Sequence, residues 1–466
     1  MGGLFSSLNS SLDALHAFDT ALQVSQNNVS NSSTPGYARQ VATLQSLPFD
    51  PSAGSGGGVQ AGATQSTQNE YADQAVRTQY SLQGNYTAQS NSLASIQSLF
   101  DVTGQTGVIG ALNGLFQSFS AWSATPNSVP AQQAVLASAQ TVAQNFQSAA
   151  NSLAGTANEL NSQITSTVQQ INSIASDIQK DNVQIQQSNS SNPGVDANLH
   201  ASLESLSQLT DVTVQFAADG TATVLLGGGQ SPLVIGNQQY SIQTGFANSD
   251  AQILDSNGSD ITGQISQGTI GGLLNVRNAV LPSLQGDSSQ PGALNQLAQQ
   301  VADRVNQILT SSTTPGGQGG TALFTYDSGN PTGVAESLTV NPNATNSTLA
   351  PASPGPPPVA NGAALTLSNL GNSTDTSDQI NGQSILQYLT SIATQVGQQA
   401  SDAQNGQTLS GTLLSQAQGV QTQISGVSLD AEAVQVLELQ KSYSAVGKMV
   451  TVVDSLTSTL INMVTA

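Results

Sequence analysis

The stretch LDAEAVQVLELQKSYSAVGKMVTVVDSLTSTL, residues 429–460, has the most regular apolar pattern in the chain. Its apolar side chains repeat every seven residues at two positions three residues apart, which is the spacing of a coiled-coil seam. A helix with one narrow apolar stripe cannot bury that stripe alone, so the pattern predicts a second amphipathic helix as its partner. The seam side chains are Leu429, Val436, Leu439, Tyr443, Val446, Val450, Val453 and Leu460.

The first 34 residues supply such a helix. Leu8, Leu15, Leu22 and Val29 fall seven residues apart, and the pattern stops at Thr34-Pro35-Gly36, a sequence that favours a turn. Pairing the two stripes as a coiled coil buries both and brings the chain ends together. Alternatively, the two helices pack separately on a globular core, but the narrow stripes at the extreme ends favour the coiled coil.

Charge and composition exclude several functional classes. The chain has 466 residues, with 7 Lys and Arg against 27 Asp and Glu, and a formal net charge of −20. Nucleic acids and anionic membrane surfaces are bound by clustered cations, so we expect neither as a partner. The chain has no Cys and two His, so we expect no catalytic residues, no metal site and no cofactor. We interpret His16 as facing solvent and His200 as structural or solvated.

Targeting signals of the ordinary secretory route are not apparent. The segment from Met1 to Leu12 has no Lys or Arg and no continuous apolar core, both of which a secretory signal needs. No continuous apolar stretch approaches the ~18 residues of a membrane-spanning helix. On these grounds alone the protein would be assigned to the cytoplasm.

The middle of the chain predicts a mainly α fold with a smaller β part. Apolar residues recur at helical spacing through most of residues 71–188 and again beyond residue 272, whereas residues 37–70 indicate extended chain and loop. Between the helical stretches the apolar period changes to two. There Asp219-Gly220 separates two alternating runs, which is a strong hairpin signal. Residues 315–362 are rich in Gly, Pro, Asn and Ser and predict two or three short edge strands.

These patterns predict an elongated molecule of four parts. The N- and C-terminal helices pair as a coiled coil, next to a helical domain in the middle, an outer β domain, and a Gly/Pro-rich insert whose membership of the β domain is left open. The predicted boundaries are residues 1–36 with 428–466 for the coiled coil, 37–208 with 265–312 and 375–427 for the helical domain, 209–264 for the β domain, and 313–374 for the insert.

Two motifs at the chain ends resemble those of a known family. Asn27-Asn28-Val-Ser-Asn31-Ser-Ser-Thr34-Pro35-Gly36-Tyr37-Ala-Arg39-Gln40 is similar to the N-terminal signature of bacterial flagellar axial proteins, which build the rod, the hook and the hook-associated segments. Ser425-Gly426-Val427-Ser-Leu429-Asp430-Ala-Glu432 resembles the matching C-terminal signature. The Tyr-x-Arg-Gln and Ser-Gly-Val forms are typical of the hook-associated branch. The likeness spans essentially the whole chain, but Asn198-Leu-His200-Ala-Ser-Leu-Glu204 lacks most of the charge usual in the family there.

The resemblance implies a mechanical function. It implies a structural subunit that acts as adaptor at the hook–filament junction and is required for filament attachment; the alternative is a hook or distal-rod protein of the same family. Such proteins leave the cell through the flagellar export channel without a cleaved signal peptide, so the implied location is the extracellular flagellum. The implied partners are further copies of the chain in a ring, the hook protein, the next hook-associated junction protein and an export chaperone on the C-terminal helix.

The resemblance also implies an assembly motif after the first helix. We interpret its asparagines as groups that form backbone and inter-subunit hydrogen bonds. The residues of the motif are Asn27, Asn28, Asn31, Thr34, Pro35, Gly36, Tyr37 and Arg39.

Two other classes of protein fit less well. A hydrolase inserted in the middle of an axial protein would need clustered Asp, Glu and His, but residues 315–362 contain only Asp327 and Glu336 of these. A surface adhesin or coiled-coil stalk is disfavoured by the Asn-Asn to Pro-Gly-Tyr motif. We therefore expect a structural protein and no enzyme.

Overall fold

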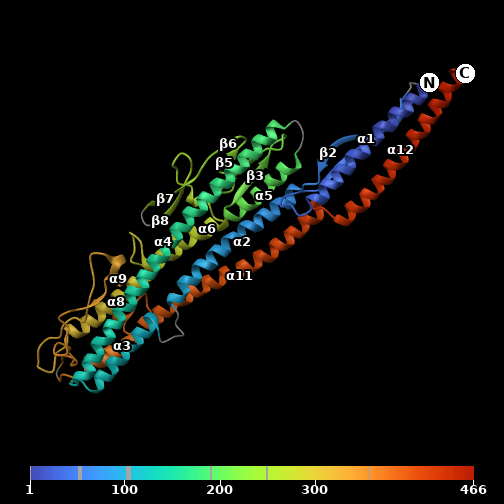
Figure 1. Ribbon diagram of the computed structural model, residues 1–466. Coiled ribbons are helices and arrows are strands. Elements are labelled where there is room, and N and C mark those ends of the chain that lie inside the picture. Colours follow the sequence, from blue (N-terminus) through green and yellow to red (C-terminus); the bar gives the residue numbers. More distant parts are fainter. Residues whose placement is uncertain are drawn as a thin grey trace.

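The computed structural model describes residues 2–50, 55–100, 106–188, 192–247, 250–355 and 357–465. The chain forms a long, narrow molecule in which the major helices run along a common direction (Figure 1). Both chain ends lie together at one end of the molecule, on a pair of helices that extends beyond the rest. The predicted elongated, mainly α fold with a smaller β part is confirmed.

The helices range from a single turn to most of the length of the molecule. The longer helices are α1 (Gly2–Ser30), α2 (Glu70–Gln97), α3 (Gly107–Ala124), α4 (Val129–Gln187), α5 (Pro193–Leu209), α8 (Gly292–Thr310), α11 (Ile385–Ser425) and α12 (Leu429–Thr465). The shorter ones are α6 (Gly268–Asn275), the π-helix η4 (Val276–Val280), α7 (Leu281–Gln285), α9 (Val334–Ser337) and α10 (Gly362–Asn369).

Helix α4 is the backbone of the molecule. It begins after Ser128 with Pro130 in its first turn, where the missing N–H of proline has no helical partner to lose. Its 59 residues correspond to about 90 Å at ~1.5 Å per residue. Helices α3, α5 and α9 and strands of three small sheets pack along it. The residues Leu153, Leu160, Ile164, Ile171 and Ile178 form its buried face, and each is at most 2% exposed.

Helices α2 and α11 pack along each other beside α4 (Figure 1). Helix α11 begins with a capping box between Ser384 and Gln387 and ends at Gly426. Close approach of the two helices depends on Gly406, because a Cβ atom there would lie 2.5 Å from the ring of Tyr86. We call all helices other than α1 and α12 the helical body, and α1 with α12 the terminal pair.

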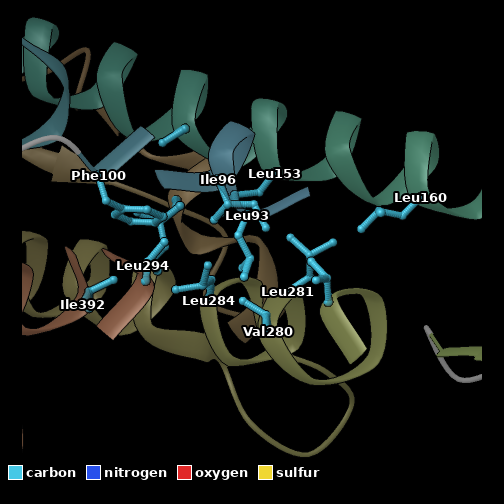
Figure 2. Close-up of a cluster of buried hydrophobic side chains, with 14 of the residues drawn as sticks. Leu93, Ile96, Phe100, Leu153, Leu160, Val280, Leu281, Leu284, Leu294 and Ile392 are labelled. Atoms are coloured by element: carbon cyan, nitrogen blue, oxygen red, sulfur yellow. The ribbon is translucent and has the colours of Figure 1, made fainter. Parts of the chain in front are cut away.

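The apolar core is centred where several helices of the body meet. Figure 2 shows side chains from α2, α4, η4, α7, α8 and α11 converging on one another, with Phe100 at one side of the cluster. Burying each such Leu or Ile contributes about 1.5–3 kcal/mol. The core residues labelled there are Leu93, Ile96, Phe100, Leu153, Leu160, Val280, Leu281, Leu284, Leu294 and Ile392.

The β structure consists of four small antiparallel sheets in the described residues. The largest has the order β3-β4-β5-β6, and the others are the hairpins β1-β2, β7-β8 and β9-β10. The strands are β1 (Gln40–Asp50), β2 (Ser55–Ser66), β3 (Val212–Phe216), β4 (Ala222–Leu226), β5 (Ser231–Ile235), β6 (Gln238–Gln239), β7 (Gln243–Ala247), β8 (Asp250–Leu254), β9 (Phe324–Thr325) and β10 (Thr339–Val340).

The hairpin at Asp219-Gly220 is confirmed. Val214 pairs with Val224 across β3 and β4, and Gly220 has a φ of 87°, a conformation that favours glycine. The Asp219 carboxylate accepts hydrogen bonds from the N–H and the hydroxyl of Thr221 at 3.0 and 2.7 Å. These bonds favour the charged form and lower the pKa of Asp219.

Two segments differ in detail from the sequence-based expectation. Residues 37–70, expected as extended chain and loop, contain the long hairpin β1-β2, which packs on α1. Within the insert 313–374, α9 and β10 contact α4, and α10 contacts α3. These contacts fasten the insert to the helical body. They do not decide the domain boundaries, which remain our proposal.

Candidate assembly site

Small side chains form the buried line of α1. Ser11, Ala14, Ala17, Ala21, Ser25 and Asn28 recur every three or four residues and are each at most 8% exposed. The hairpin β1-β2 and α12 both contact this helix. At one contact the Ser10 hydroxyl donates to the Gly57 carbonyl at 2.7 Å. Small residues therefore allow two elements to approach α1 closely.

The predicted seam residues of α1 flank this buried line. Leu8, Leu15 and Leu22 are half-buried, and Val29 is 40% exposed. The line of Ala and Ser was not predicted, because the sequence analysis counted only large apolar residues. Ala14, Ala17 and Ala21 at helical spacing were the available signal.

Helix α12 carries apolar residues on two sides. Towards α1, Leu439 is 8% exposed and Val436, Val446, Val450 and Val453 are half-buried. The other predicted seam residues, Leu429, Tyr443 and Leu460, are 53, 42 and 41% exposed. We define the outer face of α12 by six side chains that are each more than half exposed: Val434, Leu437, Met449, Val452, Leu456 and Met463.

The assembly motif forms a compact turn at the end of α1. Asn28 exchanges two hydrogen bonds of 2.8 Å with the backbone of Gln40, and the Tyr37 hydroxyl donates to the side-chain oxygens of Asn27 and Asn28 at 3.0 Å. Asn31 donates to Asn27. In this single chain, the predicted hydrogen-bonding asparagines are therefore satisfied within the molecule.

The end of the turn packs against α5. Thr34 donates through its hydroxyl to Asn31 at 3.2 Å, and Pro35 is exposed. Gly36 has a φ of 73°, and a Cβ atom there would lie 2.2 Å from the carbonyl oxygen of Ala197. Only glycine fits this position, because both the backbone conformation and the contact with α5 exclude a side chain.

An ion pair joins the motif to the start of α12. Arg39 Nε lies 2.6 Å from Glu432 Oε1, and the Arg39 guanidinium also donates to Gln435 at 2.9 Å. The Glu432 side chain is fully buried, and its Oε2 has no hydrogen-bond partner among the residues that the structure describes. Burial, and to a lesser degree the charge of Glu432, raise the pKa of Tyr37. The charge on Arg39 is therefore the main compensation for a buried carboxylate.

Backbone bonds around Arg39 complete this connection. The Arg39 N–H donates to the Ser425 carbonyl at 2.8 Å, and the Thr67 N–H donates to the Arg39 carbonyl at 2.9 Å. Ser425 Oγ in turn donates to the Thr67 carbonyl at 3.0 Å. Four elements meet here: the start of β1, the chain after β2, the end of α11 and the start of α12. We call Asn28, Tyr37, Arg39, Thr67, Ser425 and Glu432 the junction.

Sequence reasoning missed part of the junction. Glu432 stood within the quoted C-terminal signature but received no role, and Thr67 and Gln435 had no signal at all. Arg39 and Glu432 are 393 positions apart, and a single sequence gives no reason to pair them.

A second polar cluster lies behind the junction, between α2, α5 and α11. His200 Nδ1 lies 3.5 Å from the Asp73 carboxylate, and its ring stacks on Phe216 at 5.3 Å. Gln421 donates to both Asp73 and Glu204 at 2.9 Å. Burial lowers the pKa of His200, with Asp73 opposing and Arg77 adding to the effect. His200 therefore has a structural position, which is one of the two interpretations, structural or solvated, that we made from the sequence.

The described residues contain no group of three or more His, Cys, Asp and Glu that could hold a metal ion. Likewise, within the part of the chain that the structure describes, no helix is both long and apolar enough to cross a membrane. The arrangement at the chain ends offers packing surfaces and hydrogen bonds, which suit assembly with other proteins.

Comparison with known proteins identifies the family. Residues 93–324 match the family model "Flagellar hook-associated protein FlgK helical domain", and residues 418–463 match "Flagellar basal body rod FlgEFG protein C-terminal". Flagellar hook-associated protein 1 of Bacillus subtilis (strain 168) is 25% identical over 501 residues, covering 99% of each chain. The chain belongs to the FlgK family of flagellar hook-associated proteins. Its role is structural, within the flagellum.

A solved FlgK structure has a similar fold. The flagellar hook junction protein FlgK from Burkholderia pseudomallei matches with a TM-score of 0.65 and 17% identity, over 75% of this chain and 99% of that one. The FlgK match covers the middle of our chain, whereas the C-terminal match, residues 418–463, spans the end of α11 and nearly all of α12. The branch predicted from the Tyr-x-Arg-Gln and Ser-Gly-Val forms is therefore confirmed.

Proposed function

We propose that this protein is the adaptor subunit at the hook–filament junction and is required for filament attachment. The observation that carries the proposal is the terminal pair, whose outer face on α12 presents six large apolar side chains that none of the described residues covers. Exposed apolar surface of this extent is typical of an interface. In an elongated subunit with both ends of the chain at one tip, neighbouring subunits are the simplest cover.

A hook or distal-rod protein of the same axial family is the second candidate. The C-terminal match supports it, because that model describes rod proteins. The match of residues 93–324 to a helical domain of the FlgK type favours the junction. The B. pseudomallei neighbour is itself described as a hook junction protein.

The proposed partners follow from the two sides of the terminal pair. Further copies of the chain, the hook protein and the next hook-associated protein would cover the outer face of α12 after export. Before export, the long apolar stripe of α12 would be exposed and would promote aggregation. An export chaperone that binds α12 in a groove would prevent this. We propose that the protein is exported to the extracellular flagellum without cleavage of a signal peptide, and that its role there is mechanical and not catalytic.

Deletion of the gene followed by electron microscopy tests this function. The proposal predicts bare hooks, with flagellin lost to the medium, and recovery of filaments when the full chain is supplied again. Normal filaments on the deleted strain would exclude an adaptor role. Loss of the hook itself would favour the hook or distal-rod alternative.

A further inference from the structure

Each of the four small sheets is fastened to a helix by an asparagine side chain. In every case the carboxamide oxygen accepts the N–H of a residue in or next to a strand, and the carboxamide nitrogen donates to the carbonyl of that same residue. The pairs are Asn28 with Gln40, Asn172 with Ile242, Asn182 with Ala222, Asn278 with Ala251 and Asn306 with Phe324.

The bonds are short and the sites are shielded. Asn182 on α4 accepts from Ala222 at 2.8 Å and donates to the carbonyls of Ala222 and Gly236 at 2.7 and 2.8 Å, and it is fully buried. Asn28 is 1% exposed. Asn182 alone therefore holds both β4 and the turn between β5 and β6.

The other three asparagines repeat the geometry on different helices. Asn172 on α4 binds Ile242, directly before β7, at 3.0 and 2.8 Å, and Asn278 on η4 binds Ala251 of β8 at 2.9 and 2.8 Å. Asn306 on α8 accepts from Leu323 and Phe324 at 2.8 and 2.9 Å and donates to the Phe324 carbonyl at 2.9 Å.

The chemistry of these pairs requires asparagine. Its carboxamide offers one acceptor and one donor side by side, as a neighbouring strand does in a hydrogen-bonded pair of an antiparallel ladder. Aspartate has no donor when ionised and would place its charge against a carbonyl oxygen. Glutamine reaches one methylene further. A leucine, which branches at the same carbon, would leave the backbone groups unsatisfied.

The sheets have little stability of their own. Three of them have only two strands, and β9 and β10 have two residues each. Isolated two-stranded hairpins are marginal in water, whereas the helices that carry the asparagines belong mostly to the apolar core.

We propose that these asparagines are docking groups by which the helices select and place each β segment. The helical body forms first and templates the sheets that Asn172, Asn182, Asn278 and Asn306 bind, while Asn28 on α1 places the start of β1. Each asparagine acts on the β segment that it binds, and Asn172 and Asn278 share the hairpin β7-β8. Asn28 also belongs to the junction, whereas the other four asparagines act independently of the assembly role proposed above.

Hydrogen exchange on the full-length chain tests the local part of the proposal. In Asn278→Asp, amides of residues 250–254 should exchange about ten-fold faster or more, because a reciprocal pair is lost, while residues 222–235 keep their protection. Asn182→Asp and the neutral Asn182→Ala should give the reverse pattern. Asn151→Asp is the matched control. Asn151 is exposed on α4, the helix that carries Asn182, and its substitution adds the same charge.

Two outcomes would overturn the local claim. One is a uniform loss of protection in helices and strands alike, which would make the asparagines ordinary contributors to global stability. The other is strand protection no different from that of Asn151→Asp. Because Asn278 and Asn306 are only half-buried, their Asp variants remain informative even if both Asn182 variants fail to fold.

Pulse-labelled refolding from urea tests the order of folding. Residues of α4 and α8 should become protected before residues 212–254 and 324–340, and Asn278→Asp should slow protection of β8 without slowing α4. Strand protection that arises together with or before α4 would contradict the templating role.

Discussion

At the scale of single residues, the pair of Arg39 and Glu432 decides how the terminal pair meets the helical body. Glu432 is fully buried, its Oε2 lacks a hydrogen-bond partner among the described residues, and its other oxygen pairs with the Arg39 guanidinium 2.6 Å away. Removal of one partner from a buried pair is much costlier than the pair is worth, because it leaves a charge without compensation.

Arg39→Ala should therefore destabilise the junction by on the order of 3 kcal/mol. In assembled hook–filament structures, where residues 429–441 are protected, we expect faster hydrogen exchange of these residues and little change in α4, because the core of the body is untouched. The matched control is Lys180→Ala, which removes a pair of similar length, 2.8 Å, to Asp177, but with both side chains more than half exposed. Its effect should stay within about 0.5 kcal/mol.

Adding Glu432→Gln to Arg39→Ala should restore part of the lost protection, because it removes the buried charge. If Arg39→Ala is as harmless as Lys180→Ala, the ion pair does not hold the junction.

Asp181 on α4 makes stability depend on pH. Its pKa is raised from 3.8 to about 6, mainly by burial, with Asp177 adding to the rise and Lys180 opposing it. Between these two values the folded chain holds a proton that the unfolded chain has lost, so the free energy of unfolding falls as pH rises through this window. With allowance for solvent screening, the loss should be on the order of 1–2 kcal/mol.

Urea titrations from pH 4 to 7 measure this contribution. Asp181→Asn should flatten the profile in this window and raise stability at pH 7, whereas the exposed control Asp402→Asn should leave the slope unchanged. An unaltered slope in Asp181→Asn would show that this carboxyl is not responsible.

The sequence predicted the residues of the assembly motif but not what they bind. The turn at Thr34-Pro35-Gly36 follows from local chemistry, because proline and glycine constrain the backbone whatever surrounds them. The contact of Arg39 with Glu432 depends on how α1, α11 and α12 come together, which no local pattern records. The buried state of Asp181 was hidden for the same reason.

At the scale of elements, α12 has two apolar faces with different roles. The heptad pattern predicted one seam, and Val436, Leu439 and Val446 lie on the less exposed side of the helix. The pattern could not separate this side from the outer face. In the sequence, the apolar residues that one partner helix covers and those that it leaves exposed recur at the same helical spacing. Structure was needed to show which side chains α1 leaves uncovered.

Paired charges on the two faces should have different consequences. Val446→Asp with Val450→Asp puts charge between α12 and α1, so both the terminal pair and assembly should fail. Met449→Asp with Val452→Asp charges only the outer face, so the single chain should keep its structure by circular dichroism and thermal melting. Filament attachment should nevertheless be lost.

Calorimetry with the export chaperone completes this comparison. We expect the Val446→Asp and Val450→Asp variant to lose binding, and unchanged affinity would mean that this side of α12 serves assembly alone. Normal filaments with the Met449→Asp and Val452→Asp variant would show that the outer face of α12 is not needed for filament attachment.

The β3-to-β8 region is an excursion from the helical body. The chain leaves and returns at one point, where the backbones of Thr210 and Gly268 lie against each other. A Cβ atom on Gly268 would lie 2.3 Å from the backbone nitrogen of Thr210. Replacing residues 212–266 with a short Gly-Ser linker should therefore leave the helices and some filament attachment intact, at lower thermal stability because part of α4 loses its cover. Normal export of the variant with complete loss of motility would show that the region is essential for joining.

At the scale of the whole molecule, composition and shape agree with one another. The chain has a net charge of −20, no Cys and few aromatic residues, and its buried apolar residues come from α4 and the helices and strands packed along it. The length of the helical stretches made the elongated fold predictable. The packing of the insert 313–374 on α3 and α4 was not, because short Gly- and Pro-rich segments take their positions from the surface beneath them.

The central claim is that assembly completes the terminal pair. Hydrogen exchange of residues 2–30 and 429–465, in the dilute free chain and in isolated hook–filament structures, measures it most directly. An isolated pair with an uncovered apolar face gains too little to offset the ordering entropy of its backbone, ~1–2 kcal/mol per residue. We expect fast exchange in the free chain and strong protection after assembly, with α4 protected in both. Equal, strong protection of both ends in the dilute monomer would contradict it.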